Sequence, residues 1–599
     1  MIGRAMLRAL AAVFCLALVA CSNKSNSSGT VTPLTITVQM TNVPGTLTAG
    51  RTASLTATVA NDSTNAGVDW SCSPAGGCGS FNPAHTASGA TTVYTAPATG
   101  AKVTITAAST ASKSITASAD VTIVSPDTNA KLNGPYVFFV QGIDSNGIYV
   151  AAGQITADGN GKITGGVQDY ADETGLVGPD AVSGNYTIGA DGRGSITLDV
   201  SDASLPNNGV ETFSISLVSA THALVIQFDG TATSSGTLDF QTASATAPGS
   251  INGPYAFIAS GFDIFNQTPL ALGGVVSLNA TTGSIPSGDF LVNDGGSFSQ
   301  SGMTGTMTGP DAQGRGTIAI SVGLKFVYYA VRGEVLRFMG TDVPDNVSGG
   351  TICAQGPAGV SSSFSNASLN GTYAFYLSGA SFLGPLALAG QFTADGNGNF
   401  TAGVVDTDEG GSVSGGPIAG QNVYSISANG EGDLSLPGTS DTTQDVAALV
   451  IFATDPAINL LDPGAATGGG GALMLDIDTG ASGTGLVLPQ SSGAFAGDYA
   501  INLEYFNSSG EVDFVGRSAA DASGNQTGSV DVNIMGATQG AVSLTGSFKA
   551  DAANPGRGTG SLTFGGTTLA IVYYQVSGSK LLLLDAGTAD VGTGFLEKE

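Results

Sequence analysis

Hydrophobic and polar residues alternate along short runs through most of this chain. In residues 34–38 the aliphatic side chains occupy every second position, and the same pattern returns at Val103 and Ile105. A period of two residues is that of a strand with one buried face, whereas a helix would show a period near 3.6. The pattern therefore predicts an all-β protein built from many short antiparallel strands.

A short motif opens four successive segments of the chain. It occurs as Leu132–Tyr136, Ile251–Tyr255, Leu369–Tyr373 and, more loosely, Phe495–Tyr499. Its tyrosines lie 118–126 residues apart, much farther than the roughly 20–50 residues of solenoid repeats, so each unit should be a domain with its own core. We name these units repeat 1 (130–247), repeat 2 (249–360), repeat 3 (366–490) and repeat 4 (492–599).

Repeat 1 divides into strand-like runs separated by turns. The runs are 136–142, 148–157, 162–170, 184–189, 194–200, 212–218, 223–228 and 236–241. Clean alternation in Ile196–Val200 and Phe213–Leu217 indicates one apolar side and one solvent-facing side. The Asp-Gly-Asn-Gly turns within 157–161 and 394–398 supply the positive φ angles of tight hairpins. Eight neighbouring antiparallel strands can close into an up-and-down barrel, so we expect four such barrels, with β-sandwiches as the alternative.

The first twenty residues have the layout of an export signal. Arg4 and Arg8 precede an apolar run from Ala9 to Ala20. This run is too short for a membrane-spanning helix, which needs about 20 apolar residues. We therefore expect residues 1–20 to be a cleaved signal peptide.

The end of that run, Leu18–Cys21, resembles the lipobox of bacterial lipoproteins. The resemblance implies that Cys21 becomes the acylated N-terminus and holds the protein on a membrane, and stable anchoring takes more than one acyl chain. Residues 21–33 would then be a flexible polar tether. The expected location is the cell envelope, on the outer membrane, facing the periplasm or exposed at the surface.

Residues 34–125 form the first expected domain. Its segments Val68–Cys72, Tyr94–Pro97 and Val103–Ala107 resemble those of a bacterial Ig-like domain. That resemblance implies a β-sandwich in which Trp70 belongs to the core.

Cys72 and Cys78 flank a loop rich in proline and glycine. Export would place them in an oxidising compartment, so we expect a local disulfide. A zinc site would need about two further ligands, and only His85 is near in sequence.

The chain is strongly acidic, with 46 Asp and Glu against 18 Lys and Arg and a formal net charge of −28. This charge repels nucleic acid phosphates and anionic lipid headgroups, so nucleic acid is excluded as a partner. We interpret the acidity as a source of solubility rather than as a cation-binding device.

Few residues suit catalysis. The two histidines, His85 and His222, have no counterparts in the later repeats, so a Ser-His-Asp site cannot be shared between the units. His222 is expected at a hairpin turn, in contact with solvent. Residues 366–490 contain no Lys, Arg or His, which removes cationic anion clamps and histidine bases from repeat 3.

Clusters of acidic residues leave two further hypotheses open. Asp406, Asp408 and Glu409 could supply a glycosidase-like pair, although solvated turn acids are the more common explanation. Asp158 with Asn160, and Asp395 with Asn397, offer oxygen ligands for calcium, but hairpin turns explain them better and no metal site is predicted.

Cys353 has no evident partner in its own repeat and is expected to be a buried free thiol, with an intermolecular bridge as the alternative.

These features favour a lipid-anchored, non-enzymatic envelope protein that presents tandem β-domains for adhesion, carbohydrate binding or protein binding. No cofactor is expected. The alternative is a set of lipocalin-like carriers, because an eight-stranded barrel can hold one small ligand. Large interior side chains would argue against carriers, and the candidates are Phe138, Phe213, Phe228 and Phe240. A glycan-active hydrolase is the least favoured function.

Overall fold

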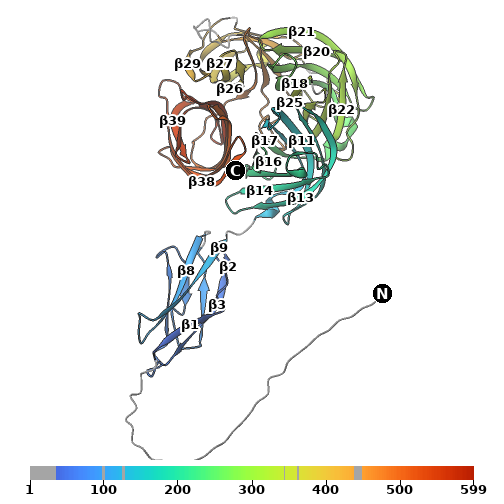
Figure 1. Ribbon diagram of the computed structural model, residues 1–599. Helices are drawn as coiled ribbons and strands as arrows, with labels where there is room; N and C mark the ends of the chain where they lie inside the picture. Colours follow the sequence, from blue (N-terminus) through green and yellow to red (C-terminus); the bar gives the residue numbers. More distant parts are fainter. Residues whose placement is uncertain are drawn as a thin grey trace, which may run out of the picture. The chain divides into compact units, whose positions relative to one another are not determined.

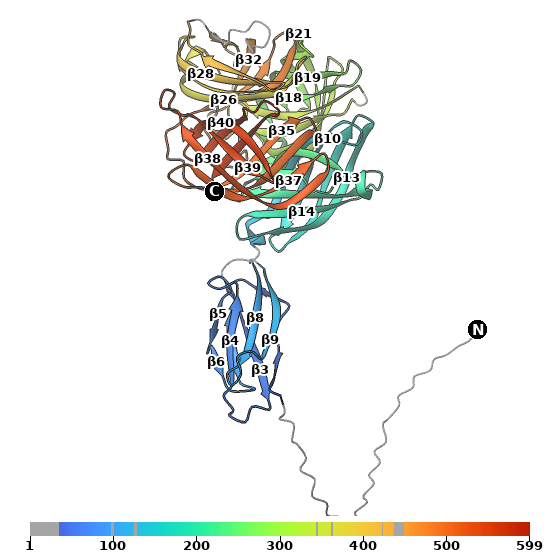
Figure 2. The ribbon, with the colours of Figure 1, turned by 60° about the vertical axis from the view of Figure 1, so that its left-hand side comes forward.

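The computed structural model describes residues 35–97, 101–124, 128–342, 345–360, 363–421, 423–436 and 448–598. These residues belong to two compact units, Met1–Ser125 and Pro126–Glu599 (Figures 1 and 2). The expected signal peptide, Cys21 and the tether 21–33 lie outside the described residues. Within the described part of the chain, no helix is long and apolar enough to cross a membrane.

The first unit is a β-sandwich. Its sheets have the strand orders β1-β3-β7-β5 and β2-β9-β8-β4-β6. The strands are β1 (Thr37–Thr41), β2 (Thr46–Thr48), β3 (Thr52–Ala60), β4 (Val68–Ser73), β5 (Ser80–Asn82), β6 (His85–Thr86), β7 (Thr91–Thr95), β8 (Ala101–Ser109) and β9 (Thr116–Val124). Trp70 lies in the core between the sheets, where it stacks on Phe81 at 5.9 Å and donates a hydrogen bond from Nε1 to Thr86 Oγ1 at 3.0 Å. A disulfide joins Cys72 and Cys78.

Repeats 1, 2 and 4 are closed eight-stranded antiparallel barrels in which each strand pairs with its neighbours in sequence. Repeat 1 consists of β10 (Asn133–Asp144), β11 (Ile148–Asp158), β12 (Lys162–Asp172), β13 (Gly175–Ile188), β14 (Arg193–Val200), β15 (Val210–Leu217), β16 (His222–Gln227) and β17 (Ala232–Phe240). Repeat 2 consists of β18 (Asn252–Asp263), β19 (Thr268–Asn279), β20 (Ser284–Asp294), β21 (Ser297–Met307), β22 (Arg315–Ile320), β23 (Lys325–Arg332), β24 (Val335–Gly340) and β25 (Asn346–Ala354). Repeat 4 consists of β35 (Gly497–Asn507), β36 (Gly510–Ala520), β37 (Asn525–Ile534), β38 (Ala537–Ala550), β39 (Arg557–Phe564), β40 (Thr567–Ser577), β41 (Lys580–Asp585) and β42 (Val591–Lys598). The all-β prediction is confirmed. These three repeats are barrels, as expected, and not the alternative β-sandwiches.

Repeat 3 departs from this plan because its strands form one nine-stranded sheet that is not closed. The strands are β26 (Asn370–Ser381), β27 (Gly384–Asp395), β28 (Phe400–Glu409), β29 (Ser412–Pro417), β30 (Tyr424–Ile426), β31 (Glu431–Ser435), β32 (Ala448–Ala453), β33 (Ala472–Asp476) and β34 (Ala481–Pro489). The fourth strand of a barrel is here divided into β29 and β30. A long segment, 454–471, also separates β32 from β33, where the other repeats have a tight turn.

Short 3₁₀ helices lie between some strands of the second unit. They are η1 (Asn129–Lys131), η2 (Pro206–Gly209), η3 (Ala243–Thr246), η4 (Pro248–Ser250) and η5 (Asn366–Ser368).

The four repeats pack against one another in a closed ring. In Figure 1, repeats 1 to 4 follow one another around it in teal, green, yellow and red. Hydrogen bonds cross each boundary. They include Arg315 to Asp169 between repeats 2 and 1, Asn293 to the carbonyl of Asp476 between repeats 2 and 3, Arg557 to Asp406 between repeats 4 and 3, and Ser214 to Asp531 between repeats 1 and 4. Strands that face a neighbouring repeat are therefore buried on both sides, as all six residues of β16 are.

This packing overturns one prediction about repeat 1. The serines of Phe213–Leu217 do not face solvent, since Ser214 and Ser216 are buried. Ser214 Oγ donates to Asp531 Oδ2 at 2.5 Å, and Ser216 Oγ donates to the Gly516 carbonyl at 2.7 Å. Because repeat 4 covers this side of β15, both serines have protein partners in place of water.

Candidate functional site

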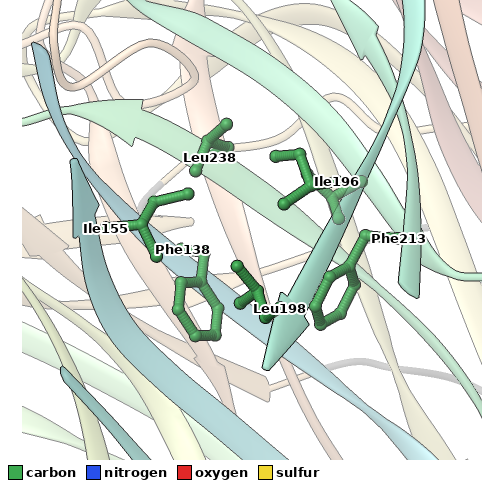
Figure 3. A pocket seen from close by; sticks show the side chains of 7 residues that line it. Phe138, Ile155, Ile196, Leu198, Phe213 and Leu238 are labelled. Atoms are coloured by element: carbon green, nitrogen blue, oxygen red, sulfur yellow. The ribbon is translucent and has the colours of Figure 1, made fainter. Parts of the chain in front are cut away.

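The interiors of the barrels are filled by side chains. In repeat 1, Phe138 and Phe213 face each other across a cavity of only about 10 Å³ (Figure 3). The interior cavity of repeat 2 measures about 30 Å³. Small-ligand pockets usually span about 300–1,000 Å³. Both cavities are therefore far smaller than such pockets.

Of the other two phenylalanines expected to fill the interior of repeat 1, only one does so. Phe240 packs against the interior core, but Phe228 lies on the outer wall, beside residues of repeat 4.

A charged clamp holds two of the four boundaries in the ring. Arg315, at the start of β22, donates Nε to Asp169 Oδ2 at 2.7 Å and Nη2 to Asp169 Oδ1 at 2.9 Å. Tyr329 also donates its hydroxyl to Asp169. Between repeats 4 and 3, Arg557 and Tyr574 bind Asp406 in the same manner. In both cases the Arg and Tyr are directly paired on adjacent strands, so one hairpin supplies both donors.

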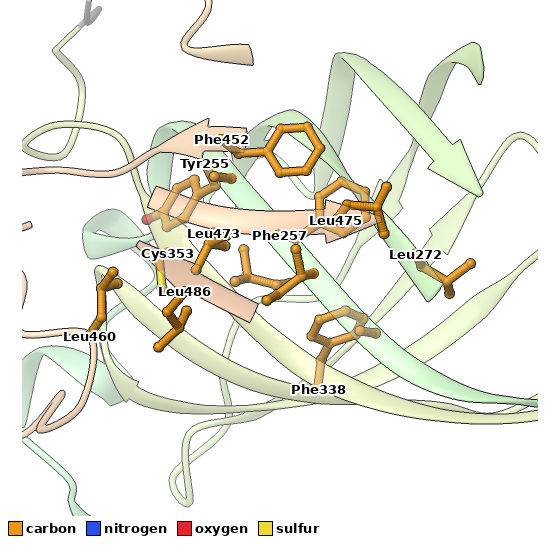
Figure 4. Close-up of a cluster of buried hydrophobic side chains, with 14 of the residues drawn as sticks. Tyr255, Phe257, Leu272, Phe338, Cys353, Phe452, Leu460, Leu473, Leu475 and Leu486 are labelled. Carbon is orange, nitrogen blue, oxygen red and sulfur yellow. The ribbon is translucent and has the colours of Figure 1, made fainter. Parts of the chain in front are cut away.

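The boundary between repeats 2 and 3 replaces this clamp with apolar packing. Leu291 of repeat 2 occupies the strand position that corresponds to Asp169 and Asp406. Phe452 of repeat 3 occupies the position that corresponds to Tyr329 and Tyr574. Both are buried in one cluster that spans the two repeats, part of which Figure 4 shows. A Cβ at Gly273 would lie 2.8 Å from Phe452 Cε2, so glycine is required for this close approach. The position of the arginine is taken by Glu431, which accepts a hydrogen bond from Gln300 Nε2 at 2.9 Å.

Charged residues from all four repeats meet where the repeats converge. We call this set the central charge cluster: His222 and Asp239 of repeat 1, Arg337 of repeat 2, Asp462 of repeat 3, and Lys580 and Glu597 of repeat 4.

His222 is the hub of this cluster. The distance from Nδ1 to Asp239 Oδ1 is 2.7 Å, and that from Nε2 to Glu597 Oε1 is 3.6 Å. The prediction that His222 meets solvent is wrong, because its side chain is only 1% exposed. Although His222 begins β16 after a turn, the neighbouring repeats cover that turn.

The surroundings favour the ionised forms of His222, Asp239 and Glu597. Burial lowers the pKa of His222, but hydrogen bonds to Asp239 and Glu597 outweigh it and raise the pKa to about 10. Burial raises the pKa of Asp239, yet Arg337 and His222 bring it down to about 2. Lys580 and His222 likewise lower the pKa of Glu597 to about 2 against the effect of burial. The cluster is an internal ion network that joins the repeats.

The acidic residues considered for glycoside hydrolysis lie at the boundary with repeat 4. Asp406 is engaged by Arg557 and Tyr574, and Asp408 is fully buried, where burial raises its pKa to about 7. Asp406, Asp408 and Glu409 do not line the cavities of repeats 1 and 2 or the cavity of about 420 Å³ in repeat 3.

The acids considered for calcium cap hairpin turns. Asp158 Oδ1 accepts the backbone N–H groups of Asn160 and Lys162, at 2.7 and 3.0 Å. Asp395 Oδ1 does the same for Asn397 and Asn399. Backbone N–H groups lower the pKa of Asp158. The side-chain amide of Asn399, followed by the backbone N–H of Asn397, lowers the pKa of Asp395. Within the described ranges, no group of three or more His, Cys, Asp or Glu residues is arranged to hold a metal ion.

Cys353 is a free, buried cysteine in the cluster between repeats 2 and 3 (Figure 4). Burial raises the pKa of its thiol to about 11, which disfavours the reactive thiolate at neutral pH.

A cavity of ligand size occurs at one end of repeat 3. It measures about 420 Å³, within the range of small-molecule sites. Tyr373, Phe364 and Leu369 supply apolar walls, while Thr454 and Asp455 supply polar groups. Ser363, Ser368 and Gly469 also line it and are exposed, so the cavity opens to solvent. We call it the repeat 3 pocket.

Sequence reasoning did not find this pocket, although a signal was present. The motif tyrosines of repeats 3 and 4 are 126 residues apart, against 118 and 119 for the earlier pairs. The longer spacing marks the extra segment 454–471, whose residues form part of the pocket wall.

Fold and site together define an all-β chain in which a β-sandwich precedes a ring of four repeats. Three of the repeats are closed barrels, and repeat 3, an open sheet, carries a pocket. No protein-family model and no curated protein matches it. A mutant of transferrin binding protein B from Haemophilus parasuis is 11% identical, covering 78% of this chain and 96% of that chain with a TM-score of 0.17. Intact Ap-TbpB, with N and C lobes, is 10% identical, covering 78% and 95% with a TM-score of 0.17. Kievitone hydratase from Nectria haematococca is 10% identical, covering 37% and 90% with a TM-score of 0.14. TM-scores this low carry no argument about what this chain does.

Proposed function

We propose that this protein is a lipid-anchored, non-enzymatic component of the cell envelope that binds a carbohydrate or protein ligand on its ring of barrels. The observation that carries the proposal is the repeat 3 pocket, a ligand-sized cavity on a unit whose other described interiors are filled. The Ig-like sandwich would serve as a spacer between the anchor and the ring.

The anchor rests on the sequence. The basic start, the apolar run and the residues Leu18–Cys21 support acylation of Cys21 and a place on the outer membrane. The acidity of the chain suits exposure outside the cytoplasm, because a high net charge keeps a protein soluble.

The absence of an enzymatic function is supported by the chemistry of the pocket. Its one carboxylate, Asp455, accepts the backbone N–H of Ala457 at 2.9 Å, as in a turn cap. Neither histidine lies there, since His222 is in the central charge cluster and His85 pairs with Asp69 in the first unit. A glycoside hydrolase would need two carboxyl groups facing each other across the substrate.

Two experiments test this function. The full-length protein, purified in detergent, is applied to arrays of glycans, cell-wall fragments and envelope proteins, and binding to at least one class is expected. Replacement Cys21→Ala should move the protein from the membrane to the soluble fraction. Blank arrays would refute the binding function, and unchanged fractionation would refute the anchor.

A further inference from the structure

We propose that the repeat 3 pocket binds a neutral saccharide and that the hydroxyl of Tyr373 donates a hydrogen bond that orients it. This inference rests on the proposed binding function and names its ligand class.

The motif tyrosine has a fixed task in the closed barrels. Each donates its hydroxyl to a carbonyl in the turn between the sixth and seventh strands. The bonds are Tyr136 to Ala220 at 2.9 Å, Tyr255 to Gly333 at 2.7 Å and Tyr499 to Gly578 at 2.8 Å. The bond ties the first strand to that turn and closes one end of the barrel.

Repeat 3 keeps the tyrosine but lacks its acceptor. The hydroxyl of Tyr373 accepts the Asn370 N–H at 3.3 Å, and among the described residues no acceptor receives its proton. The turn that would supply the carbonyl is replaced by segment 454–471. Tyr373 instead lines the pocket, so a hydrogen-bond donor faces a space where the other repeats have protein.

Segment 454–471 is held back from Tyr373 by contacts elsewhere in the ring. The Asp455 N–H donates to the Ala354 carbonyl at 2.9 Å, and Asp462 accepts the Thr221 hydroxyl at 3.1 Å. Ile458 and Leu460 are buried in the cluster between repeats 2 and 3 (Figure 4). These contacts hold the segment against repeats 1 and 2.

The lining selects the ligand class. Residues 355–490 contain no Lys, Arg or His, so the pocket offers no cationic side chain to a phosphate, carboxylate or sulfate. Phe364, Leu369 and the part of Tyr373 that lines the pocket provide apolar surface that suits the C–H face of a sugar. Thr454, Asp455 and the Tyr373 hydroxyl provide polar groups for sugar hydroxyls. Small-molecule sites usually have mainly apolar walls with a few polar groups.

The test is calorimetric titration of the full-length protein with neutral hexoses, N-acetylhexosamines and their disaccharides. Glucuronate, sialic acid and an alkylamine are titrated in parallel. Binding of at least one neutral sugar, with weaker or absent binding of the charged probes, is expected. Preference for the acidic sugars or the amine would overturn the ligand class while leaving the proposed binding function in place.

Matched tyrosine variants locate the site. Tyr373→Phe should weaken binding by about five- to tenfold, the effect of one lost hydrogen bond, with little change in the unfolding midpoint. Tyr499→Phe removes the same atom from the closed barrel, so it should lower the unfolding midpoint and leave sugar affinity unchanged. Equal affinities for Tyr373→Phe and the unmodified protein would overturn the inference. Wild-type protein that binds envelope proteins but no saccharide would also overturn it, and the broader function would survive.

Discussion

Arg557 and Asp406 form a bidentate pair between repeats 4 and 3, with Nε to Oδ2 at 2.7 Å and Nη2 to Oδ1 at 2.8 Å. Both side chains are mostly buried, at 17% and 11% exposure. Arg315 and Asp169 repeat the arrangement between repeats 2 and 1. The ring therefore uses the same contact twice, from equivalent positions of two repeats.

Arg557→Ala should destabilise the second unit by about 3 kcal/mol, because it leaves Asp406 as a buried charge without its partner. The measurement is the free energy of unfolding in urea, followed by circular dichroism. Arg193→Ala is the matched control. Arg193 holds the equivalent place at the boundary of repeats 1 and 4 but lies 3.8 Å from Asp531, so a smaller loss is expected.

The apolar boundary between repeats 2 and 3 suggests a rescue. Asp406→Leu with Tyr574→Phe and Arg557→Met copies the residues Leu291 and Phe452 and removes all three polar partners together. This triple variant should be more stable than Arg557→Ala alone, since replacing a whole buried ion network by apolar groups costs little. A triple variant as unstable as the single one would contradict the account of the clamp.

The central charge cluster predicts a loss of stability at high pH. The pKa of His222 in the folded protein is about 10, above its ordinary value of 6.5, so its contribution is complete below pH 6.5 and disappears as the pH rises through 10. His222→Gln should therefore be less stable than the unmodified protein at pH 6, and the difference should shrink by pH 10. Urea unfolding at a series of pH values measures this, and a constant difference would contradict it.

Asp513 predicts a further loss of stability with rising pH, in this case from a buried carboxyl. Burial raises its pKa well above 3.8, so the folded protein keeps the proton while the unfolded chain has lost it, and stability falls as the pH rises above about 4. Asp513→Asn should raise the unfolding midpoint at pH 8 and change it little at pH 4. Asp158→Asn is the control with a lowered pKa, and it should have no stabilising effect at pH 8. Equal effects of Asp513→Asn at both pH values would refute the assignment.

The disulfide should stabilise the first unit alone. Replacing Cys72 and Cys78 by serine removes the closure of a short loop, which contributes about 2 kcal/mol. Trp70 is the one tryptophan of the chain and lies in the sandwich core, so its fluorescence reports unfolding of this unit. The midpoint of unfolding followed by Trp70 fluorescence should therefore be lower in the variant. The main circular dichroism transition, dominated by the larger unit, should not move, and a shift there would show that the two units are coupled.

Strands and turns were predictable because their signals are local. Alternation and Asp-Gly turns placed all eight strands of repeat 1, although its fourth strand begins at Gly175 rather than at residue 184. The missed part contains Pro179 and irregular pairing with β12, which hide the alternation.

The ring was not predictable from the same signals. Contacts such as those of His222 with Glu597 join residues far apart in sequence, and local periodicity carries no information about them. An indirect signal existed in continuous apolar runs such as Leu581–Leu584. This run is buried on both sides of its strand, because one side faces the barrel core and the other side faces a neighbouring repeat. Runs of this kind are typical of strands covered on both faces.

The four boundaries join unlike surfaces of successive repeats, and such a head-to-tail geometry ends in a closed circle only for one copy number. A chain shortened by one repeat would leave two boundary surfaces without partners, one at each end of an arc. Two such arcs could satisfy each other only by joining end to end, so loss of a repeat should yield filaments or aggregates in place of a smaller circle. Duplication within this chain is therefore constrained by geometry as well as by stability.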